Sequence, residues 1–334
     1  MTTFSVVVPA HQAQATLQPC LEAIVRAGFD PGEIIVVNDG SRDRTGEIAR
    51  SFGVRVVTNQ FPLRPAGARN RGVDAADGEV VLFIDADVVL QDLIRPRLVQ
   101  HFSDAAITAV IGSYDDRADG GSTLSDYRNL LHHHVHQKSG GISPTFWTGI
   151  GAVRREAFVA AGGLKSEWEN IEDVEFGLRL SAVDGYILLD PTIQGTHLKV
   201  WTANSMFMTD LFGRAIPWSR LIQSGRTRFG PLNTTVRHQA AAAGVAIMFA
   251  GALASLAAPV MALAMLAGLA LFLLAASDVL VTLRRKRGLW FAVRAIPWHM
   301  LHYSAALLGF ARVRLERFWD RLIGNGPEKR SPQA

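Results

Sequence analysis

Two carboxylates, Asp85 and Asp87, lie with a single residue between them in the apolar run VVLFIDADVVL, residues 80–90. Burying an unpaired carboxylate in such a run is costly. Either the strand stops at Ile84 and the acids begin an exposed turn, or the acids hold a cation that they share with a ligand. Mg²⁺ and Mn²⁺ prefer carboxylate oxygens and use one or two of them together with substrate phosphates. The spacing therefore predicts a site for a divalent metal.

Polar residues also follow two other expected strands. Pro9 and Ala10 end the run FSVVVPA just before His11, and Asp39 belongs to VVNDGSRDRT, which follows the second strand. Asp39 is suited to accept hydrogen bonds from a base or a ribose. A plain Asp-Gly turn followed by a helix cap from Ser41 or Asp43 produces the same pattern.

The segment GARNRG brings Arg69 and Asn70 to the start of an expected helix, where both can face a diphosphate. For the neighbouring Arg71, a solvated helix face is an equally good interpretation.

The segment WENIEDVEFGLRL, residues 168–180, has the pattern of an amphipathic helix. Asp173 is a candidate general base, and Glu172 a candidate for binding an acceptor hydroxyl. The alternative is structural: Asn170 caps the helix and Asp173 completes an arrangement like a capping box.

Histidines occur in two places that suggest metal binding. His197, in THLKVW, is either a metal ligand or a structural residue. His132 and His136 lie one helical turn apart in LHHHVHQ. Because neither cysteines nor an HExxH motif accompany this pair, we do not expect zinc there.

The elements that position these residues alternate over about the first 200 residues. Strands are expected in FSVVVPA, EIIVVND, VRVVTN and EVVLFIDAD, and helices at residues 14–27, 44–52 and 66–76. This rhythm predicts an α/β fold with a mainly parallel sheet and helices on both faces. Ligands of such sheets bind at the carboxyl ends of the strands, where the candidate residues lie.

The composition limits the protein class. The 334 residues are 49% hydrophobic and only 19% charged, with a net charge of +4 and arginines crowded into the C-terminal third. This favours an anionic membrane surface over nucleic acid as a partner. Cys20 is the only cysteine, which excludes an intramolecular disulfide. The start MTTFSVVVPAH has no cationic region, so we expect no signal peptide.

Residues 238–283 carry one charge, Asp278. They predict two membrane-spanning helices, at about 239–258 and 261–283, with a turn near Pro259. A long buried helix or an apolar core pair is the alternative. Arginine and lysine flank both ends, which predicts that both flanks are cytoplasmic. Residues 289–311 are interrupted by polar residues and favour an interfacial helix, followed by a basic tail. The predicted domains are therefore 1–225, a membrane anchor at 226–288, and 289–334.

Five motifs in this order resemble family 2 glycosyltransferases over about residues 4–200. They are SVVVPAHQAQATLQPCLEAI, IIVVNDGSRDRT, GARNRGVDAADGEVVLFIDADVVL, GIGAVRREAF and ENIEDVEFGLRL. The resemblance implies a GT-A fold, an inverting mechanism, a nucleoside-diphosphate sugar donor and Mg²⁺ or Mn²⁺.

The resemblance also implies roles for individual residues. Pro9, Asp39 and Arg69 line the nucleotide site, and Asp173 matches the catalytic base. Asp87, with Asp85 close by, binds metal and diphosphate, and His197 is similar to the additional ligand of some members. The expected protein is a multi-pass enzyme of the inner membrane, with its catalytic domain in the cytoplasm and a lipid or cell-envelope glycan precursor as acceptor.

Two departures from the family pattern matter. Asn38 stands where the family often has aspartate, and the Q-x-x-R-W signature of processive synthases is absent, since GRAIPW at 213–218 matches it only weakly. We therefore expect a single transfer. A polyprenyl-phosphate glycosyltransferase is the nearest alternative, because a phosphate acceptor needs no base. A non-catalytic nucleotide-sugar-binding membrane protein is the alternative from another class.

Overall fold

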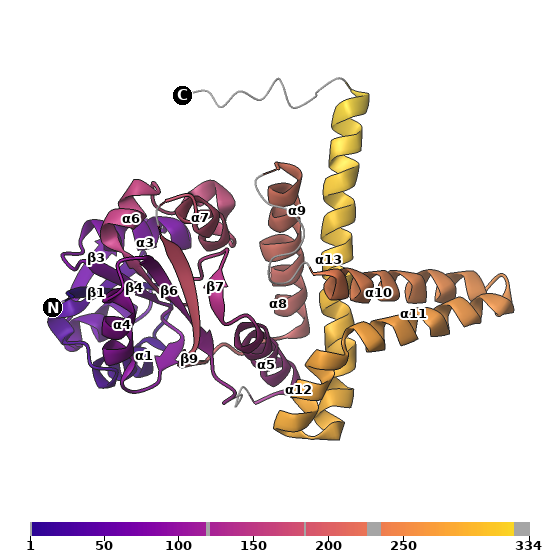
Figure 1. Ribbon diagram of the computed structural model, residues 1–334, viewed down its shortest axis with the longest axis horizontal. Helices are drawn as coiled ribbons and strands as arrows, with labels where there is room; N and C mark the ends of the chain where they lie inside the picture. Colours follow the sequence, from indigo (N-terminus) through magenta and orange to yellow (C-terminus); the bar gives the residue numbers. More distant parts are fainter. Residues whose placement is uncertain (1, 118–120, 184, 226–234, 324–334) are drawn as a thin grey trace. The chain divides into compact units, whose positions relative to one another are not determined.

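The computed structural model describes residues 2–117, 121–183, 185–225 and 235–323. The chain forms two compact units (Figure 1). Unit 1 comprises Met1–Thr202 and Thr282–Ala292, and unit 2 comprises Ala203–Val281 and Val293–Ala334. This division differs from the predicted boundaries at 225 and 288, because the sheet-bearing unit ends earlier and includes a short later segment.

Unit 1 is built on one sheet. Its strands are β1 (Phe4–Ala10), β2 (Ile34–Asp39), β3 (Arg55–Asn59), β4 (Val80–Ile84), β5 (Val88–Leu90), β6 (Ile107–Tyr114), β7 (Gly141–Ser143), β8 (Ile150–Arg154) and β9 (Tyr186–His197). Its helices are α1 (Leu17–Arg26), η1 (Pro31–Glu33), α2 (Thr45–Ser51), α3 (Arg64–Asp74), α4 (Ile94–Phe102), α5 (Thr123–Lys138), α6 (Arg155–Ala160), η2 (Ser166–Trp168) and α7 (Glu172–Leu180). The four strands and three helices predicted from the sequence rhythm are present with shifted ends.

The strand order is β3-β2-β1-β4-β8-β6-β9-β5, with β7 paired to β9. The first four strands are parallel, as the alternation of strands and helices predicted. Strand β8 then runs antiparallel between β4 and β6, whereas β9 is parallel to β6. Because β8 is antiparallel, the residues that precede it lie at the same edge as the carboxyl end of β4.

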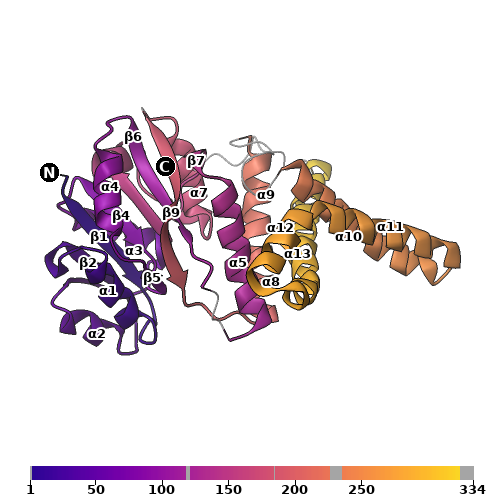
Figure 2. The same cartoon turned by 60° about the horizontal axis from the view of Figure 1, so that its bottom comes forward.

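Each face of the sheet buries its own core, because side chains alternate along a strand. On β1, Val6 and Val8 pack with Leu21 of α1 on one face, whereas Val7 packs on the other face with residues of α3, α6 and α7. Figure 2 shows α1 and α4 in front of the strands. The two cores hold the carboxyl edge of the parallel strands in place.

Unit 2 is helical. It contains α8 (Ala203–Met208), the π-helix η3 (Thr209–Ala215), α9 (Ile216–Gln223), α10 (Val236–Ser255), η5 (Pro259–Met261), α11 (Ala262–Ala275), the start of α12 (Ser277–Arg287) and most of α13 (Leu289–Leu322). Residues 289–311, predicted as a separate interfacial segment, belong to the continuous 34-residue helix α13.

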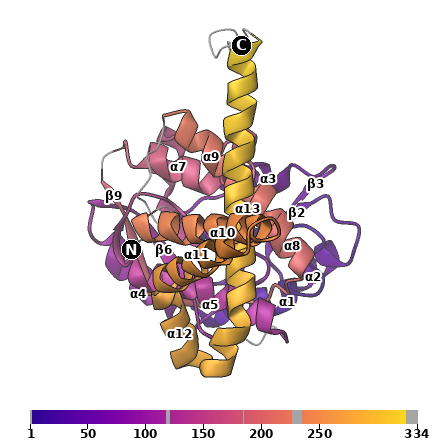
Figure 3. The same cartoon turned by 90° about the vertical axis from the view of Figure 1, so that its right-hand side faces the viewer.

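Helices α10 and α11 lie side by side (Figures 1 and 3). Glycines make this close approach: a Cβ on Gly268 would lie 2.4 Å from the backbone nitrogen of Met248. The apolar side chains that face away from this contact are exposed, and Leu253 and Leu263 keep 72% and 67% of their surface.

By length and composition, α10 is the one helix among the described residues that could cross a membrane by itself. The predicted second span, 261–283, is a bent pair, because the chain turns by 63° between Ala275 and Ser277. Asp278, the charge within that span, forms an ion pair of 3.2 Å with Arg237 at the start of α10. Asp278 therefore has a cationic partner within unit 2.

Candidate active site

A cavity of about 670 Å³ lies at the carboxyl edge of the parallel strands, within the size range of ligand pockets. Its walls come from the ends of β1, β2 and β4, the start of α3, and the segment after β9. They consist of Pro9, Ala10, His11, Gln12, Ala13, Thr16, Asp39, Pro62, Arg64, Pro65, Ala68, Arg69, Asp85, Ala86, Asp87, Leu198, Lys199 and Val200. The structure thus brings six of the predicted site residues to one cavity.

Asp39 is buried at the end of β2. Its Oδ1 accepts hydrogen bonds from Asn59 Nδ2 (2.8 Å) and from the backbone N–H of Leu63 (2.7 Å). These bonds hold the carboxylate in one orientation at the cavity wall. The next residue, Gly40, has φ +67°, a conformation that glycine adopts without strain.

Asn38 and Asp43 have structural partners. Asn38 Oδ1 accepts a hydrogen bond from the backbone N–H of Ser41, so this departure from the family pattern supports the turn. Asp43 Oδ1 accepts one from the backbone N–H of Thr45, and Oδ2 one from Gln14. Asp43 therefore orders the turn before α2, but the N-cap residue of that helix is Arg44.

Arg69 is buried and joins two motifs that are far apart in the sequence. Its Nη2 donates to Asp85 Oδ1 (2.6 Å), and its Nη1 donates to Glu172 Oε1 (2.9 Å). Burial alone lowers the pKa of a guanidinium, but the charges of Asp85 and Glu172 raise the pKa of Arg69 overall. The D-x-D turn and the Glu-Asp motif are therefore both in contact with the guanidinium of Arg69.

Asn70 does not line the cavity, contrary to the prediction. Its Nδ2 donates to the carbonyl of Leu164 (2.8 Å), and its Oδ1 accepts from the N–H of the same residue (3.0 Å). Both ends of the amide are thus used to hold the backbone near Leu164. Successive helix positions point in different directions, so Arg69 and Asn70 cannot both face the cavity.

The acids of the D-x-D turn lie between β4 and β5, and the side chains of Asp85 and Asp87 are 31% and 32% exposed. Asp85 is directed to Arg69, whereas Asp87 Oδ2 lies 3.4 Å from His197 Nε2. Burial raises the pKa of Asp87, but the hydrogen bond from His197 and the charge of Lys199 lower it below the ordinary value overall. Asp87 is therefore ionised at neutral pH.

Among the described residues, no group of three or more His, Cys, Asp or Glu side chains is placed to hold a metal. Asp87, on the cavity wall, is nevertheless in contact with the imidazole of His197, which is not itself a lining residue. They suit Mg²⁺ or Mn²⁺, because these ions accept one or two protein ligands and complete their shell with water and phosphate oxygens. The residues present fit a cation that completes its shell with water or with diphosphate oxygens.

Asp173 is half-buried at the start of α7. Its Oδ2 accepts from the backbone N–H of Thr148 (3.3 Å) and lies 3.4 Å from Thr148 Oγ1, and its Oδ1 accepts from the N–H of Val174. The helix begins at Glu172, and Asn170 has φ +69° without a capping bond. The capping-box interpretation of Asn170 and Asp173 is therefore wrong.

Glu172 was predicted to bind an acceptor hydroxyl, but its side chain is 6% exposed and paired with Arg69. A buried carboxylate with such a partner is positioned for a charge network rather than for contact with a substrate. Its Oε2 has no hydrogen-bond partner among the described residues. Burial, followed by the charge of Asp173, raises the pKa of Glu172.

Sequence reasoning missed Thr148 and Lys199. Thr148 directly precedes the GIGAVRREAF motif, and only the antiparallel direction of β8 brings it to Asp173. Lys199 follows the predicted ligand His197 by two residues and lines the cavity. The sequence did hold a signal for Lys199, because it is a basic residue that closely follows an expected strand end.

His132 and His136 pack as aromatic rings. The ring of His132 lies edge-on to Tyr114, and that of His136 lies 4.7 Å from Trp147.

The N-terminal part of the chain is similar to a known family of proteins. Residues 5–160 match the sequence model of Glycosyl transferase family 2. Glycosyltransferase GlyG of Streptococcus pneumoniae is 34% identical over 123 residues, which cover 35% of this chain and 41% of GlyG. The putative glycosyltransferase EpsH of Bacillus subtilis is 27% identical over 191 residues, 52% of this chain and 54% of EpsH. The chain thus spans about half or less of these curated relatives.

One solved structure resembles most of the chain. The mannosyltransferase PcManGT from Pyrobaculum calidifontis, in complex with GDP-Man and Mn²⁺, aligns with a TM-score of 0.59 at 18% identity. The alignment covers 93% of this chain and 87% of that protein, and at this identity it shows a common fold. Residues 5–160 thus match a family 2 glycosyltransferase domain, and the fold is GT-A-like.

Proposed function

We propose that this protein is an inverting glycosyltransferase that moves a sugar from a nucleoside-diphosphate sugar to a hydroxyl group of a lipid or glycan acceptor. The observation that carries this proposal is the position of Arg69. Its guanidinium contacts both Asp85 of the D-x-D turn and Glu172, the neighbour of Asp173. A donor in the cavity and an acceptor at Asp173 would therefore meet beside the guanidinium of Arg69.

Different cavity residues bind different parts of the donor. Asp39, held by Asn59 and the backbone of Leu63, accepts hydrogen bonds from the base or the ribose. Asp87 and His197 hold the divalent cation, with Asp85 next to them. The cation supplies positive charge against the leaving diphosphate. Lys199, on the cavity wall, adds a positive charge on the same side.

Asp173 acts as the general base. It takes the proton from the acceptor hydroxyl as the hydroxyl oxygen attacks the anomeric carbon on the face opposite the diphosphate. Two hydrogen bonds from Thr148 and Val174 aim the carboxylate. Burial raises the pKa of Asp173, which makes it a stronger base than an exposed aspartate. From an α-linked donor, the product is a β-glycoside.

The variant Asp173→Asn tests the role of the base. We expect donor binding to persist and transfer to a hydroxyl acceptor to fall by about 10²- to 10⁴-fold, the usual contribution of general base catalysis. Near-normal transfer would instead indicate a phosphate acceptor, as in a polyprenyl-phosphate glycosyltransferase. If the wild-type protein neither transfers nor hydrolyses the sugar of any donor, nucleotide-sugar binding is the only activity that remains.

The donor is open to a direct screen. Thermal unfolding with Mn²⁺ and UDP-, GDP- or dTDP-sugars identifies it, because a ligand stabilises the folded state by RT ln(1 + [L]/Kd). GDP-mannose comes first, since the mannosyltransferase of similar fold was solved with GDP-Man and Mn²⁺.

Helices α10 and α11 are proposed to insert into the inner membrane as a hairpin, with the glycosyltransferase domain in the cytoplasm. Their outward apolar side chains support this, because a core helix of a soluble unit buries such residues. The 14-residue helix α11 is about 21 Å long, shorter than the hydrocarbon core. The bend after Ala275 and the basic residues of α12 would then lie near the lipid headgroups.

A further inference from the structure

His197 presents its two ring nitrogens to different partners. It ends β9, and its side chain is 10% exposed. Nε2 lies 3.4 Å from Asp87 Oδ2, and Nδ1 lies 3.3 Å from Asn129 Oδ1. An imidazole binds a metal through one nitrogen only when that nitrogen carries no proton. The partner of the other nitrogen therefore decides which one is available.

Asn129, on α5, is buried and makes a second contact with the same histidine. Its Nδ2 donates to the backbone carbonyl of His197 (3.2 Å). A carbonyl oxygen only accepts hydrogen bonds, so the nitrogen of the amide must be the end that faces it. The oxygen Oδ1 then faces the ring, and it can only accept a hydrogen bond from Nδ1–H. In the neutral ring, the lone pair of Nε2 is then on the side of Asp87, where a cation would take the place of the proton through which His197 otherwise donates to Asp87.

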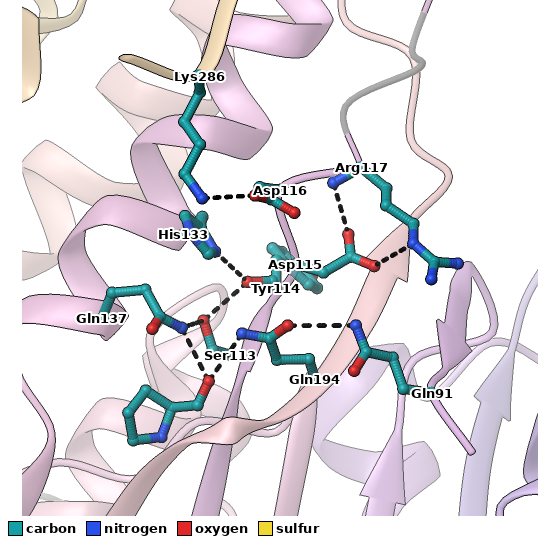
Figure 4. Close-up of polar contacts among 11 residues, drawn as sticks. Gln91, Ser113, Tyr114, Asp115, Asp116, Arg117, His133, Gln137, Gln194 and Lys286 are labelled. Atoms are coloured by element: carbon teal, nitrogen blue, oxygen red, sulfur yellow. Dashed lines mark hydrogen bonds and ion pairs between the residues drawn. The ribbon is translucent and has the colours of Figure 1, made fainter. Parts of the chain in front are cut away.

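The ring is also held on its face and through its backbone. The ring of Tyr114 stacks on it at 4.4 Å with an angle of 6° between the planes. The carbonyl of Tyr114 accepts a hydrogen bond from His133, one turn after Asn129 on α5 (Figure 4). Asp115 Oδ2 accepts one from the hydroxyl of Thr196 (2.6 Å), next to His197. Strand β6 and helix α5 together leave the imidazole little freedom to rotate.

We propose that Asn129 is a positioning residue that fixes the tautomer of His197, so that Nε2 is available to the divalent cation beside Asp87. This inference rests on the proposed function, in which His197 is a metal ligand. Outer partners of this kind typically change metal affinity by about 10- to 100-fold when they are removed.

The test measures Mn²⁺ binding to the full chain by the EPR signal of the free ion, with Mn²⁺ alone as the probe. We compare wild type, His197→Ala, Asn129→Leu and the double variant. Gln137→Leu is the matched control, because Gln137 (Figure 4) lies on the same helix. Its amide donates to another β9 carbonyl, that of Pro191. Unfolding midpoints without metal show whether each variant is folded.

We expect His197→Ala and Asn129→Leu each to weaken Mn²⁺ binding by about 10-fold or more. The double variant should be no weaker than His197→Ala, because Asn129 acts through the imidazole. Gln137→Leu should bind as wild type does.

Three results would overturn the inference. If Asn129→Leu binds Mn²⁺ normally while His197→Ala does not, or if the two losses add in the double variant, Asn129 does not act through His197, and the metal role of His197 stands. If His197→Ala itself binds normally, the metal assignment in the proposed function fails as well.

Discussion

At the scale of single residues, the two acids of the D-x-D turn have different partners and should not be equivalent. Asp87 contacts His197, whereas Asp85 is paired with Arg69. We expect Asp87→Ala to abolish metal-dependent donor binding and Asp85→Ala to weaken it, because metal-bridged diphosphates need the carboxylate at the metal. Calorimetry with the donor, with and without EDTA, measures both. Undiminished metal-dependent affinity in the Asp87 variant would disprove the assignment.

The pH dependence of the reaction follows from Asp173. Burial raises its pKa above the ordinary value of 3.8, although the charge of Arg69 opposes this. A base works only when it is deprotonated, so kcat/KM should fall as the pH drops through this raised pKa. Rates measured from pH 4 to pH 9 should therefore show an acidic limb above the ordinary pKa. A rate that stays flat down to pH 4 would contradict the role of Asp173.

At the scale of elements, α10 and α11 depend on glycine at their contact. A Cβ at Gly268 would lie 2.4 Å from backbone, which cannot move as a side chain can. We expect Gly268→Val to destabilise this helix pair by about 1–3 kcal/mol, the usual cost of overpacking. The measurement is the unfolding midpoint in detergent. Ala267→Val on the exposed side of α11 is the control, and equal effects of the two variants would rule out a close contact.

The segment of α12 that belongs to unit 1 is another feature at this scale. Lys286 Nζ lies 2.5 Å from Asp116 Oδ2 at the end of β6, and His134 Nδ1 lies 2.8 Å from the hydroxyl of Thr282 (Figure 4 shows the first contact). The ammonium of Lys286 lowers the pKa of Asp116. Lys286, one of the basic residues that flank the predicted membrane segment, thus has its partner in unit 1.

At the scale of the whole molecule, the proposed hairpin places its turn across the membrane from the glycosyltransferase domain. Single cysteines at the exposed positions Ala257 and Ser51 in a Cys20→Ala background test this. We expect an impermeant maleimide to label only Ala257→Cys in spheroplasts, because the cationic flanks stay on the cytoplasmic side. Both sites should react after lysis. Labelling of Ser51→Cys before lysis, or of neither site, would refute the topology.

Much of this protein follows from its sequence, where the signal is local. The apolar β-branched runs predicted the four parallel strands, because a strand buried on both faces needs such residues. Polar residues at strand ends predicted the cavity, since parallel strands end at one edge. Asp39, Arg69, Asp85 and Asp87 line it for that reason.

Only the tertiary structure decided the features that depend on distant parts of the chain. Glu172 and Asn70 were assigned to ligands, but burial beside Arg69 and Leu164 uses their polar groups inside the protein. Asn129 reaches His197 because β6 and α5 pack beside β9, a pairing that no local pattern encodes. Hydrogen bonds between such residues depend on how distant elements pack together, so spacing along the chain could not predict them.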